Sequence, residues 1–297
     1  MIPYVVLIDL DGTIVGNVSS LVGEWLLLQE KDKRKIRLYK NFLLKQLQNG
    51  IIRPNFADFC AMTSKHLSNV EYFVYTASGT SWANFLIPCI EEVCGIRFQR
   101  PIFTRKFCTL KNGDYRKSIE DVLPEILKRL KKQYPDLKNV SQLQDMVCLI
   151  DNNEVLGKNE KHKLIKCPTY DFIEYYDVFS RLNIDLIEND TDCTSVAKNL
   201  MQYGLFPNSS KTNIPRNVFK YQYYYQLCQN IKNAIIHQQN NVNSSPTTDK
   251  FWLILAHIIT HMSSSLKFNK RTIQKIQTRL NHECSKYEGN DSMKEKR

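Results

Sequence analysis

The chain of 297 residues lacks the sequence features of a secreted or membrane protein. Its longest apolar candidate for a membrane span, residues 251–262, is too short and contains His257 and His261. The N-terminus has no basic start and no cleavage signal, and Asp9 and Asp11 interrupt its apolar run. None of the nine cysteines belongs to a Cys-x-x-Cys pair, so neither a zinc ribbon nor a redox pair is indicated. We therefore expect an intracellular protein of the cytoplasm or nucleus, with reduced thiols and no membrane contact.

Acidic residues are also scarce in the last third of the chain. Residues 198–297 contain 15 Lys or Arg and 5 Asp or Glu, which accounts for +10 of the net charge of +11. Four of these cations recur every four residues along a predicted helix, namely Lys267, Arg271, Lys275 and Arg279. Such a stripe indicates a possible nucleic-acid partner, and a role in solubility alone is the alternative.

The strongest functional signal lies near the N-terminus. Residues 5–8 are four consecutive apolar residues, which predict a short buried strand. Asp9 and Asp11 follow directly, and carboxylates at the end of a buried strand are costly unless a cation balances them. Because ligands bind at the carboxyl ends of strands in open α/β sheets, we interpret the two residues as the edge of a metal and phosphate site. A strand that simply ends in an Asx turn is the alternative.

Two later segments repeat this pattern of a strand followed by polar residues. Segment 71–75 is rich in strand-forming residues, and segment 146–150 is an apolar run. The polar residues that follow them are Thr76, Ala77 and Ser78 in the first case, and Asp151 and Asn152 in the second. Hydroxyl and backbone N–H groups of the first set could wrap a phosphate or merely form a turn. The oxygens of the second set, together with those of Asp9, suggest a shared cation.

Helical periodicity between these strands predicts an α/β fold with a parallel sheet. Helices are expected between residues 21 and 49 and at 56–67, 81–93, 119–132, 170–182, 196–205, 219–236, 251–262 and 267–286, with another strand at 163–167. The composition changes near residues 188–192, so we predict a catalytic domain of residues 1–190. Residues 191–297 are expected to form a mostly helical basic accessory region, disordered from Glu288 onwards.

The segment before the 119–132 helix offers several candidates for a catalytic cation. Residues 100–110 are predicted to be a strand or an extended segment, and residues 111–114 have the pattern of a hairpin turn. The candidate cations are Lys106, Lys111, Arg116 and Lys117. Periodicity does not choose among them.

Four short motifs in this order resemble the haloacid dehalogenase (HAD) superfamily. They are residues 9–13 (Asp-Leu-Asp-Gly-Thr), residues 76–78 (Thr-Ala-Ser), Lys117 and residues 150–152 (Ile-Asp-Asn). Arg53-Pro54 before a helix, and residues 108–117, which lead from a cysteine to a lysine, resemble more narrowly the RNA polymerase II C-terminal-domain phosphatases and NLI-interacting-factor-like phosphatases. The resemblance covers residues 1–185 and implies a HAD-like Rossmannoid sheet with helices on both faces. Together with the Asn, Lys and Ile bias, it would suit a large DNA virus.

Three features depart from the family pattern. Gly12 stands where the family often has a larger residue, and Asn153 stands where it usually has serine. Segment 17–50 has helical periodicity, whereas the phosphatase family has a small β-insert. These departures leave the mode of substrate recognition open.

The resemblance implies a role for each motif residue. Asp9 would be the nucleophile that forms an aspartyl-phosphate, and Asp11 the general acid and base. Thr76, Ala77 and Lys117 would bind the phosphate. Magnesium would be held by Asp9, the Asp11 backbone carbonyl and Asn152, with Asp151 orienting either the metal shell or Lys117.

These roles predict a Mg²⁺-dependent phosphatase. Only 41 residues separate Thr76 from Lys117, too few for a large cap domain beside a helix and a strand, so an open site and a phosphoserine or phosphothreonine in a protein are favoured. A small-molecule or polynucleotide-end phosphatase is one alternative. A weakly catalytic module that binds nucleic acid or protein is the other.

Overall fold

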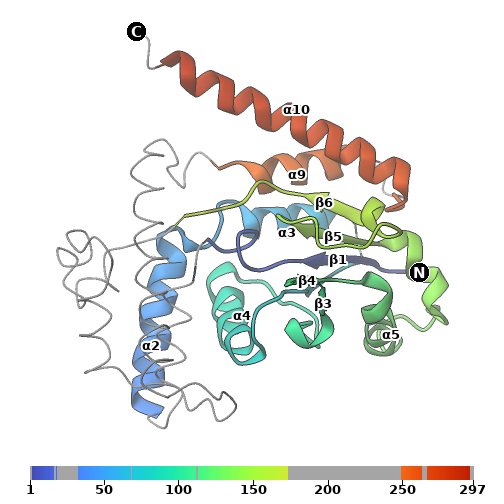
Figure 1. Cartoon of the computed structure of the whole chain (residues 1–297), viewed down its shortest axis with the longest axis horizontal. Coiled ribbons are helices and arrows are strands. Elements are labelled where there is room, and N and C mark those ends of the chain that lie inside the picture. The colour runs from blue at the N-terminus through green and yellow to red at the C-terminus, as the bar shows by residue number, and fades with distance from the viewer. Residues whose placement is uncertain are drawn as a thin grey trace. The chain divides into compact units, whose positions relative to one another are not determined.

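The structure is a computed structural model that describes residues 2–16, 18, 33–67, 69–111, 113–172, 249–262 and 266–294. The chain forms two compact units. The first contains residues 1–15, 52–170 and 247–297, and the second contains residues 16–51 and 171–246. Figure 1 labels the elements along the chain.

The first unit is built on a parallel sheet of four strands in the order β2-β1-β5-β6. The strands are β1 (Tyr4–Ile8), β2 (Val70–Val74), β5 (Val147–Asp151) and β6 (Leu164–Lys166). All five residues of β1 are buried, as the apolar run predicts for a strand covered on both faces. The predicted α/β fold class with a parallel sheet is therefore confirmed.

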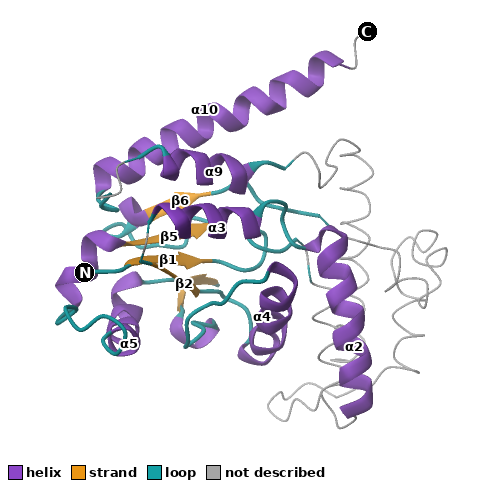
Figure 2. Cartoon of the chain, turned by 180° about the vertical axis from the view of Figure 1, so that it is seen from behind, coloured by secondary structure: helices purple, strands orange, loops and turns teal. Residues whose placement is uncertain are grey.

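Side chains that alternate along β1 pack against two different layers of helices. Val5 and Leu7 belong to a core cluster that includes the buried face of α5 (Ile119–Leu130). On the other face, the ring of Tyr4 lies 5.8 Å from that of Phe268. Figure 2 shows α3 and α9 side by side, with α5 apart from them.

The helix pair α3 (Phe56–His66) and α9 (Phe251–Thr260) is joined by aromatic side chains. The ring of Trp252 lies 4.8 Å from that of Phe59 and 5.0 Å from that of Phe56. Trp252 is completely buried. Thus α9 contributes a central part of the core on this face.

The segment between β2 and β5 contains the helices and the hairpin that lead to Lys117. In chain order it forms α4 (Thr80–Cys94), a 3₁₀ turn η2 (Arg105–Phe107), β3 (Thr109–Lys111), β4 (Asp114–Arg116), α5 and η3 (Val140–Met146). The antiparallel β3–β4 pair confirms the predicted hairpin turn. Residues 100–110 form less strand than predicted, because Phe103 makes only an isolated bridge to Tyr75. The turn η2 comes next, and in it the N–H of Phe107 donates to the carbonyl of Thr104 at 2.8 Å.

The helix α10 (Lys270–Lys294) completes the first unit. Its Gln277 side chain donates to the carbonyl of Lys166 at 3.0 Å and accepts from the same residue's N–H at 2.8 Å, along the outer side of β6. The helix continues past Glu288, where the sequence predicts disorder, because extending an existing helix costs much less than starting one. The predicted boundary near residue 190 lies outside the described residues, whereas α9 and α10 pack within the sheet unit.

The described part of the second unit is helical. The helix α2 (Lys33–Gln46) confirms part of the helical insert predicted for residues 17–50, and η1 (Leu47–Ile51) follows with Gly50 at a φ of 116°. The backbone N–H of Gly16 donates to the carbonyl of Ile51 at 2.8 Å. Of the helix expected at 170–182, only residues 170–172 are described, and they are not helical. The helices expected at 196–205 and 219–236 lie outside the described residues, as does the first part of the segment between 21 and 49. Among the helices described in either unit, none has the length and apolarity needed to cross a membrane.

Candidate active site

The carboxyl ends of three neighbouring strands meet at one edge of the sheet. Ile8 is paired with Val74 of β2 on one side and with Ile150 of β5 on the other. The N–H of Asp9 still donates to Ile150 at 2.9 Å, and the N–H of Tyr75 donates to Ile8 at 2.9 Å. The register therefore places the residues after each strand side by side, as the sequence predicts.

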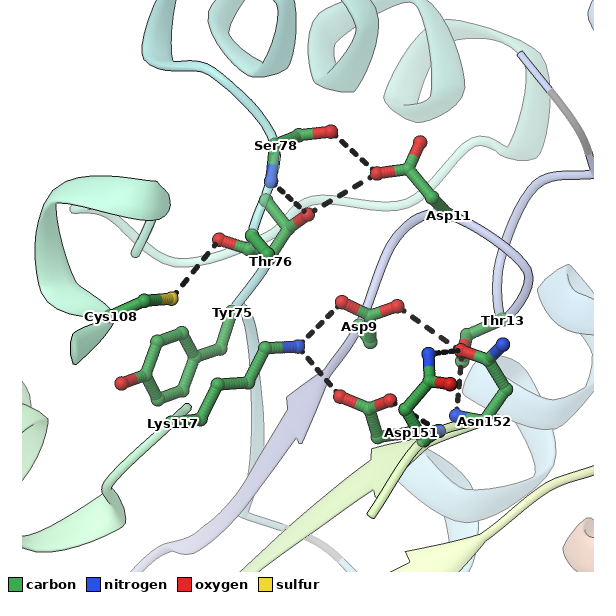
Figure 3. Close-up of polar contacts among 12 residues, drawn as sticks. Asp9, Asp11, Thr13, Tyr75, Thr76, Ser78, Cys108, Lys117, Asp151 and Asn152 are labelled. Carbon is green, nitrogen blue, oxygen red and sulfur yellow. Dashed lines mark hydrogen bonds and ion pairs between the residues drawn. The ribbon is translucent and has the colours of Figure 1, made fainter. Parts of the chain in front are cut away.

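Lys117 lies between two carboxylates of this edge (Figure 3). Its Nζ is 2.5 Å from Oδ1 of Asp9 and 2.7 Å from Oδ2 of Asp151, and its own side chain is 1 % exposed. Burial acts to lower the pKa of Lys117, but the two carboxylates outweigh it and raise the pKa above its ordinary value. The ring of Tyr75, 5.4 Å from Nζ, covers the ammonium group from another side. The lysine is therefore held in its charged form.

Asp9 carries a strongly perturbed carboxyl group. Burial raises its pKa, Lys117 lowers it, and the neighbouring charges of Asp151 and Asp11 raise it again. Because two carboxylates contact the one lysine and the charge of Asp11 also acts on Asp9, the lysine alone does not neutralise the cluster. A second cation at this position would offset the remaining negative charge.

Asp11 points toward the end of β2 rather than toward Lys117 (Figure 3). Its Oδ2 accepts a hydrogen bond of 2.5 Å from the Ser78 hydroxyl and a longer one of 3.5 Å from the Thr76 hydroxyl. Burial raises the pKa of Asp11, and the Ser78 hydroxyl acts to lower it. The Thr76 hydroxyl also accepts from the N–H of Ser78 at 3.0 Å. These contacts fix Asp11 beside the segment predicted to bind phosphate.

Thr13 connects Asp9 with Asn152 on the other side of the site. Its Oγ1 lies 3.4 Å from Oδ2 of Asp9 and 3.2 Å from Oδ1 of Asn152, and it accepts from the N–H of Asn152 at 3.2 Å. The Asn152 amide nitrogen donates to Oγ1 of Thr169 at 3.2 Å, and its Oδ1 accepts from Thr13, the residue that also contacts Asp9. Gly12 has a φ of 74°, and a Cβ there would lie 2.7 Å from the Asn152 amide nitrogen. A larger residue at position 12 would therefore displace Asn152.

The oxygen atoms around Thr13 fit a magnesium ion. The Thr13 hydroxyl has one proton for Oδ2 of Asp9 and Oδ1 of Asn152, whereas Oδ1 of Asn152 also accepts from the Asn153 side chain at 3.0 Å. When the hydroxyl proton goes to Asn152, Oδ2 of Asp9 is left without this donor. Mg²⁺ prefers hard oxygen ligands and uses only one or two carboxylates. Within the described parts of the chain, no group of three or more His, Cys, Asp or Glu side chains is suited to a metal. A site here would combine Asp9, the Asn152 amide and the backbone carbonyl of Asp11.

Asp151 has little freedom to bind a metal directly. Its Oδ2 contacts Lys117, and its Oδ1 accepts from the N–H of Asn153 at 2.7 Å. Of the two roles predicted for Asp151, this geometry favours the orientation of Lys117.

The structure also distinguishes the predicted site residues from their competitors. Of the candidate cations, Lys106, Lys111 and Arg116 are exposed, and Lys117 is buried against Asp9. Two residues to which the sequence prediction gave no individual role, Thr13 and Ser78, contact Asp9 and Asp11 respectively. Both belong to the motifs already identified, so the presence of a hydroxyl group within each motif was the feature from which their contacts could have been predicted.

A comparison with protein families identifies residues 4–179 as matching the NLI interacting factor-like phosphatases. The chain belongs to this family. The match covers more than half of the 297 residues and confirms the resemblance predicted from the four motifs. The helices α9 and α10 lie beyond the residues that match the NLI interacting factor-like phosphatases.

Two solved structures of the RNA polymerase II CTD phosphatase Fcp1 are similar to this chain. One is a variant of fission yeast Fcp1 bound to beryllium fluoride, with 16 % identity, a TM-score of 0.35 and coverage of 82 % of this chain and 66 % of that chain. The other, also Fcp1, has 19 % identity, a TM-score of 0.33 and coverage of 82 % and 65 %. The chain thus spans slightly less than two thirds of each. A comparison with curated protein sequences finds no match.

Proposed function

We propose that the chain is a Mg²⁺-dependent phosphatase that acts through an aspartyl-phosphate on Asp9, with phosphoserine or phosphothreonine in proteins as its substrate. The observation that carries the proposal is the position of Asp9, between Lys117 at 2.5 Å and the Thr13–Asn152 pair. Its membership of a phosphatase family supports the same reaction class.

In the first step, Oδ1 of Asp9 attacks phosphorus, and the bond from phosphorus to the substrate oxygen breaks. Asp11 gives its proton to the departing oxygen, and its raised pKa favours the protonated form that this step needs. Lys117, which contacts Oδ1 of Asp9, offsets the negative charges of the carboxylate and of the phosphoryl group as they approach each other. Thr76 and the backbone of Ala77 hold phosphate oxygens at the end of β2.

In the second step, a water molecule attacks the phosphorus of the aspartyl-phosphate and releases inorganic phosphate. Asp11, now ionised, accepts the proton of this water. A bound Mg²⁺ would supply positive charge next to Asp9 and the phosphate oxygens. Asp9, Asn152 and the Asp11 carbonyl would hold it.

A protein substrate is favoured over a small metabolite because the site has little cover in the described part of the chain. Between Thr76 and Lys117 the described residues form α4, η2 and the β3–β4 hairpin, with no separate cap domain. Metabolite phosphatases need enclosure to exclude water around a small substrate. A phosphorylated segment of a protein can enter an open site.

The test is a phosphate-release assay with a phosphopeptide panel, sugar phosphates and phosphorylated nucleic-acid ends, with and without Mg²⁺. We expect turnover of phosphopeptides that a chelator abolishes. Asp9→Asn should lower kcat by about 10³-fold or more, because the nucleophile is lost. The matched control is Asp114→Asn on the exposed hairpin, which should keep wild-type activity. Equal turnover by Asp9→Asn would exclude the mechanism, and a preference for the other substrates would exclude a protein substrate.

A second candidate function, nucleic-acid binding, is favoured by a basic cavity of about 460 Å³ at α10. Its walls include Lys267, Lys275 and Arg279, which are all exposed. Phosphate contacts by such cations make binding steeply salt-dependent. Lys275→Gln should weaken nucleic-acid binding and reduce by about one the slope of the logarithm of the binding constant against the logarithm of the salt concentration. Lys128→Gln on α5 should change neither quantity. Absence of binding at low salt would exclude this function.

A further inference from the structure

The side chain of Arg53 is completely enclosed although it carries a permanent charge. It is 1 % exposed, and its Nε and Nη2 form a bidentate ion pair with the carboxylate of Asp249 at 2.9–3.0 Å. The rings of Phe251 and Tyr170 lie 4.5 and 5.5 Å from the guanidinium carbon. A buried guanidinium needs such partners, because water does not reach it.

Asp249 belongs to the part of the chain that the family match does not include. It lies just before α9, and its Oδ1 accepts from the N–H of Phe251 at 3.1 Å. Its own carbonyl accepts from the side chain of Asn55 at 3.3 Å, next to the start of α3. The charge that neutralises Arg53 therefore comes from a segment outside the family match, and two further hydrogen bonds hold it in place.

The remaining donor of Arg53 reaches toward the candidate active site. Nη1 donates to the carbonyl of Pro168 at 2.8 Å. Pro168 lies in the segment 167–170 that follows β6, and this segment makes three contacts with the site. The backbone N–H of Cys167 donates to the carbonyl of Asp151 at 3.0 Å, and the backbone N–H of Tyr170 donates to the carbonyl of Gly12 at 2.9 Å. The hydroxyl of Thr169 accepts from the side-chain amide of Asn152 at 3.2 Å.

We propose that Asp249 and Arg53 are positioning residues: the pair holds segment 167–170 so that Thr169 and Tyr170 orient Asn152 and the Gly12 turn for magnesium. The pair does not touch substrate or metal. Loss of the Asp249 charge leaves Arg53 without its counter-ion, so Arg53 shifts toward water and releases the Pro168 carbonyl. The Asn152 amide nitrogen then loses the partner that fixes the orientation of its side chain beside Thr13. This inference rests on the proposed function only in naming magnesium as the ligand.

The test compares Asp249→Asn with Glu91→Gln. Glu91 is the matched control, because it is also buried and forms a bidentate ion pair with Arg100 at 3.0 Å, within the same unit but away from the site. Deuterium exchange of a peptide that covers residues 167–172 is measured without metal, and Mg²⁺ binding is measured by calorimetry. We expect Asp249→Asn to speed exchange at the Tyr170 amide and to weaken Mg²⁺ binding by about tenfold. Glu91→Gln should leave both at wild-type values although it too lowers Tm.

A second variant keeps the proposal testable if Asp249→Asn does not fold. Thr169→Val removes the acceptor of the Asn152 amide from an exposed position, so it should weaken Mg²⁺ binding with little change in Tm. Where both variants fold, their effects on Mg²⁺ binding should not add, because they act through the same amide. Unchanged Tyr170 exchange in Asp249→Asn, or unchanged Mg²⁺ binding in Thr169→Val, would overturn the proposal. If the wild-type protein binds no Mg²⁺, the proposed function fails, and the Tyr170 exchange rate still decides whether the pair holds the segment.

Discussion

Nζ of Lys117 lies 2.7 Å from Oδ2 of Asp151, and both side chains are 1 % exposed. Neither charge is solvated, so each depends on the other for its stability in the folded state. A buried ion pair of this kind is not needed for the stability of the fold, because proteins with apolar residues of similar volume in its place are often at least as stable. Its presence next to Asp9 fits the role proposed for the lysine in phosphate transfer.

Lys117→Met should remove the only cation that contacts Asp9 and Asp151 among the described residues. We expect a loss of about 3–5 kcal/mol in the free energy of unfolding, because two buried carboxylates then face one another unpaired. Urea unfolding of both proteins checks this. Adding Asp9→Asn to the variant should recover part of the loss, because one of the opposing charges is removed. A loss below about 1 kcal/mol, the range of exposed pairs, would contradict the assigned geometry.

Ser78→Ala should change the pH dependence of the reaction. The Ser78 hydroxyl donates to Asp11 and acts to lower the pKa of that carboxyl, so its removal raises the pKa. Asp11 must be protonated to assist the departing oxygen. The alkaline limb of the pH–rate profile should therefore shift to higher pH, by about one pH unit. Ser141→Ala, which removes a surface hydroxyl bonded to Asn139, should leave the profile unchanged. A limb that moves downward would argue against Asp11 as the general acid.

Gly12→Ala should weaken both the fold and the metal site. The backbone has a φ of 74°, where a non-glycine residue costs about 1–2 kcal/mol, and the added Cβ would lie 2.7 Å from the Asn152 amide nitrogen. Gly113→Ala provides the control, because Gly113 has a φ of 85° and no atom within 4 Å of its added Cβ. Both variants should unfold more easily, and only Gly12→Ala should weaken Mg²⁺ binding. Equal Mg²⁺ affinity in the two variants would show that Asn152 tolerates a side chain at position 12.

Trp252→Ala should show how much α9 contributes to the sheet unit. Its indole is completely buried against Phe56 and Phe59, so we expect a loss of about 3–5 kcal/mol in the free energy of unfolding. Leu110→Ala on the β3–β4 hairpin, where the side chain is 62 % exposed, should change it by less than about 0.5 kcal/mol. Chemical denaturation measures both. A small effect of Trp252→Ala would mean that α9 is dispensable for the fold.

The sequence predicts the edge of the sheet well because the relevant signals are local. Each of β1, β2 and β5 is an apolar or β-rich run with polar residues directly after it, so Asp9, Thr76 and Asn152 could be placed without knowledge of the fold. Lys117 could not be chosen in this way, because three other cations lie in the eleven residues before it. Only the resemblance to the phosphatase family selected it, and burial separates it from those competitors.

Contacts between residues that are far apart in the sequence could not be predicted from hydrophobic periodicity. Arg53 and Asp249 are 196 positions apart, and neither belongs to a pattern that refers to the other. The same holds for α9 and α10: their apolar faces predicted helices correctly, but an amphipathic helix does not reveal which surface it covers. The helices were therefore assigned to a separate accessory region, although they pack within the sheet unit.

The Gln277 amide contributes to solubility as well as to packing. A strand at the border of a sheet exposes unpaired peptide groups, onto which a strand of another molecule can add. By bonding both peptide groups of Lys166, Gln277 occupies a position that such a strand would use. Detachment of α10 would therefore open β6 to edge-to-edge association, so the last helix also protects the protein against aggregation.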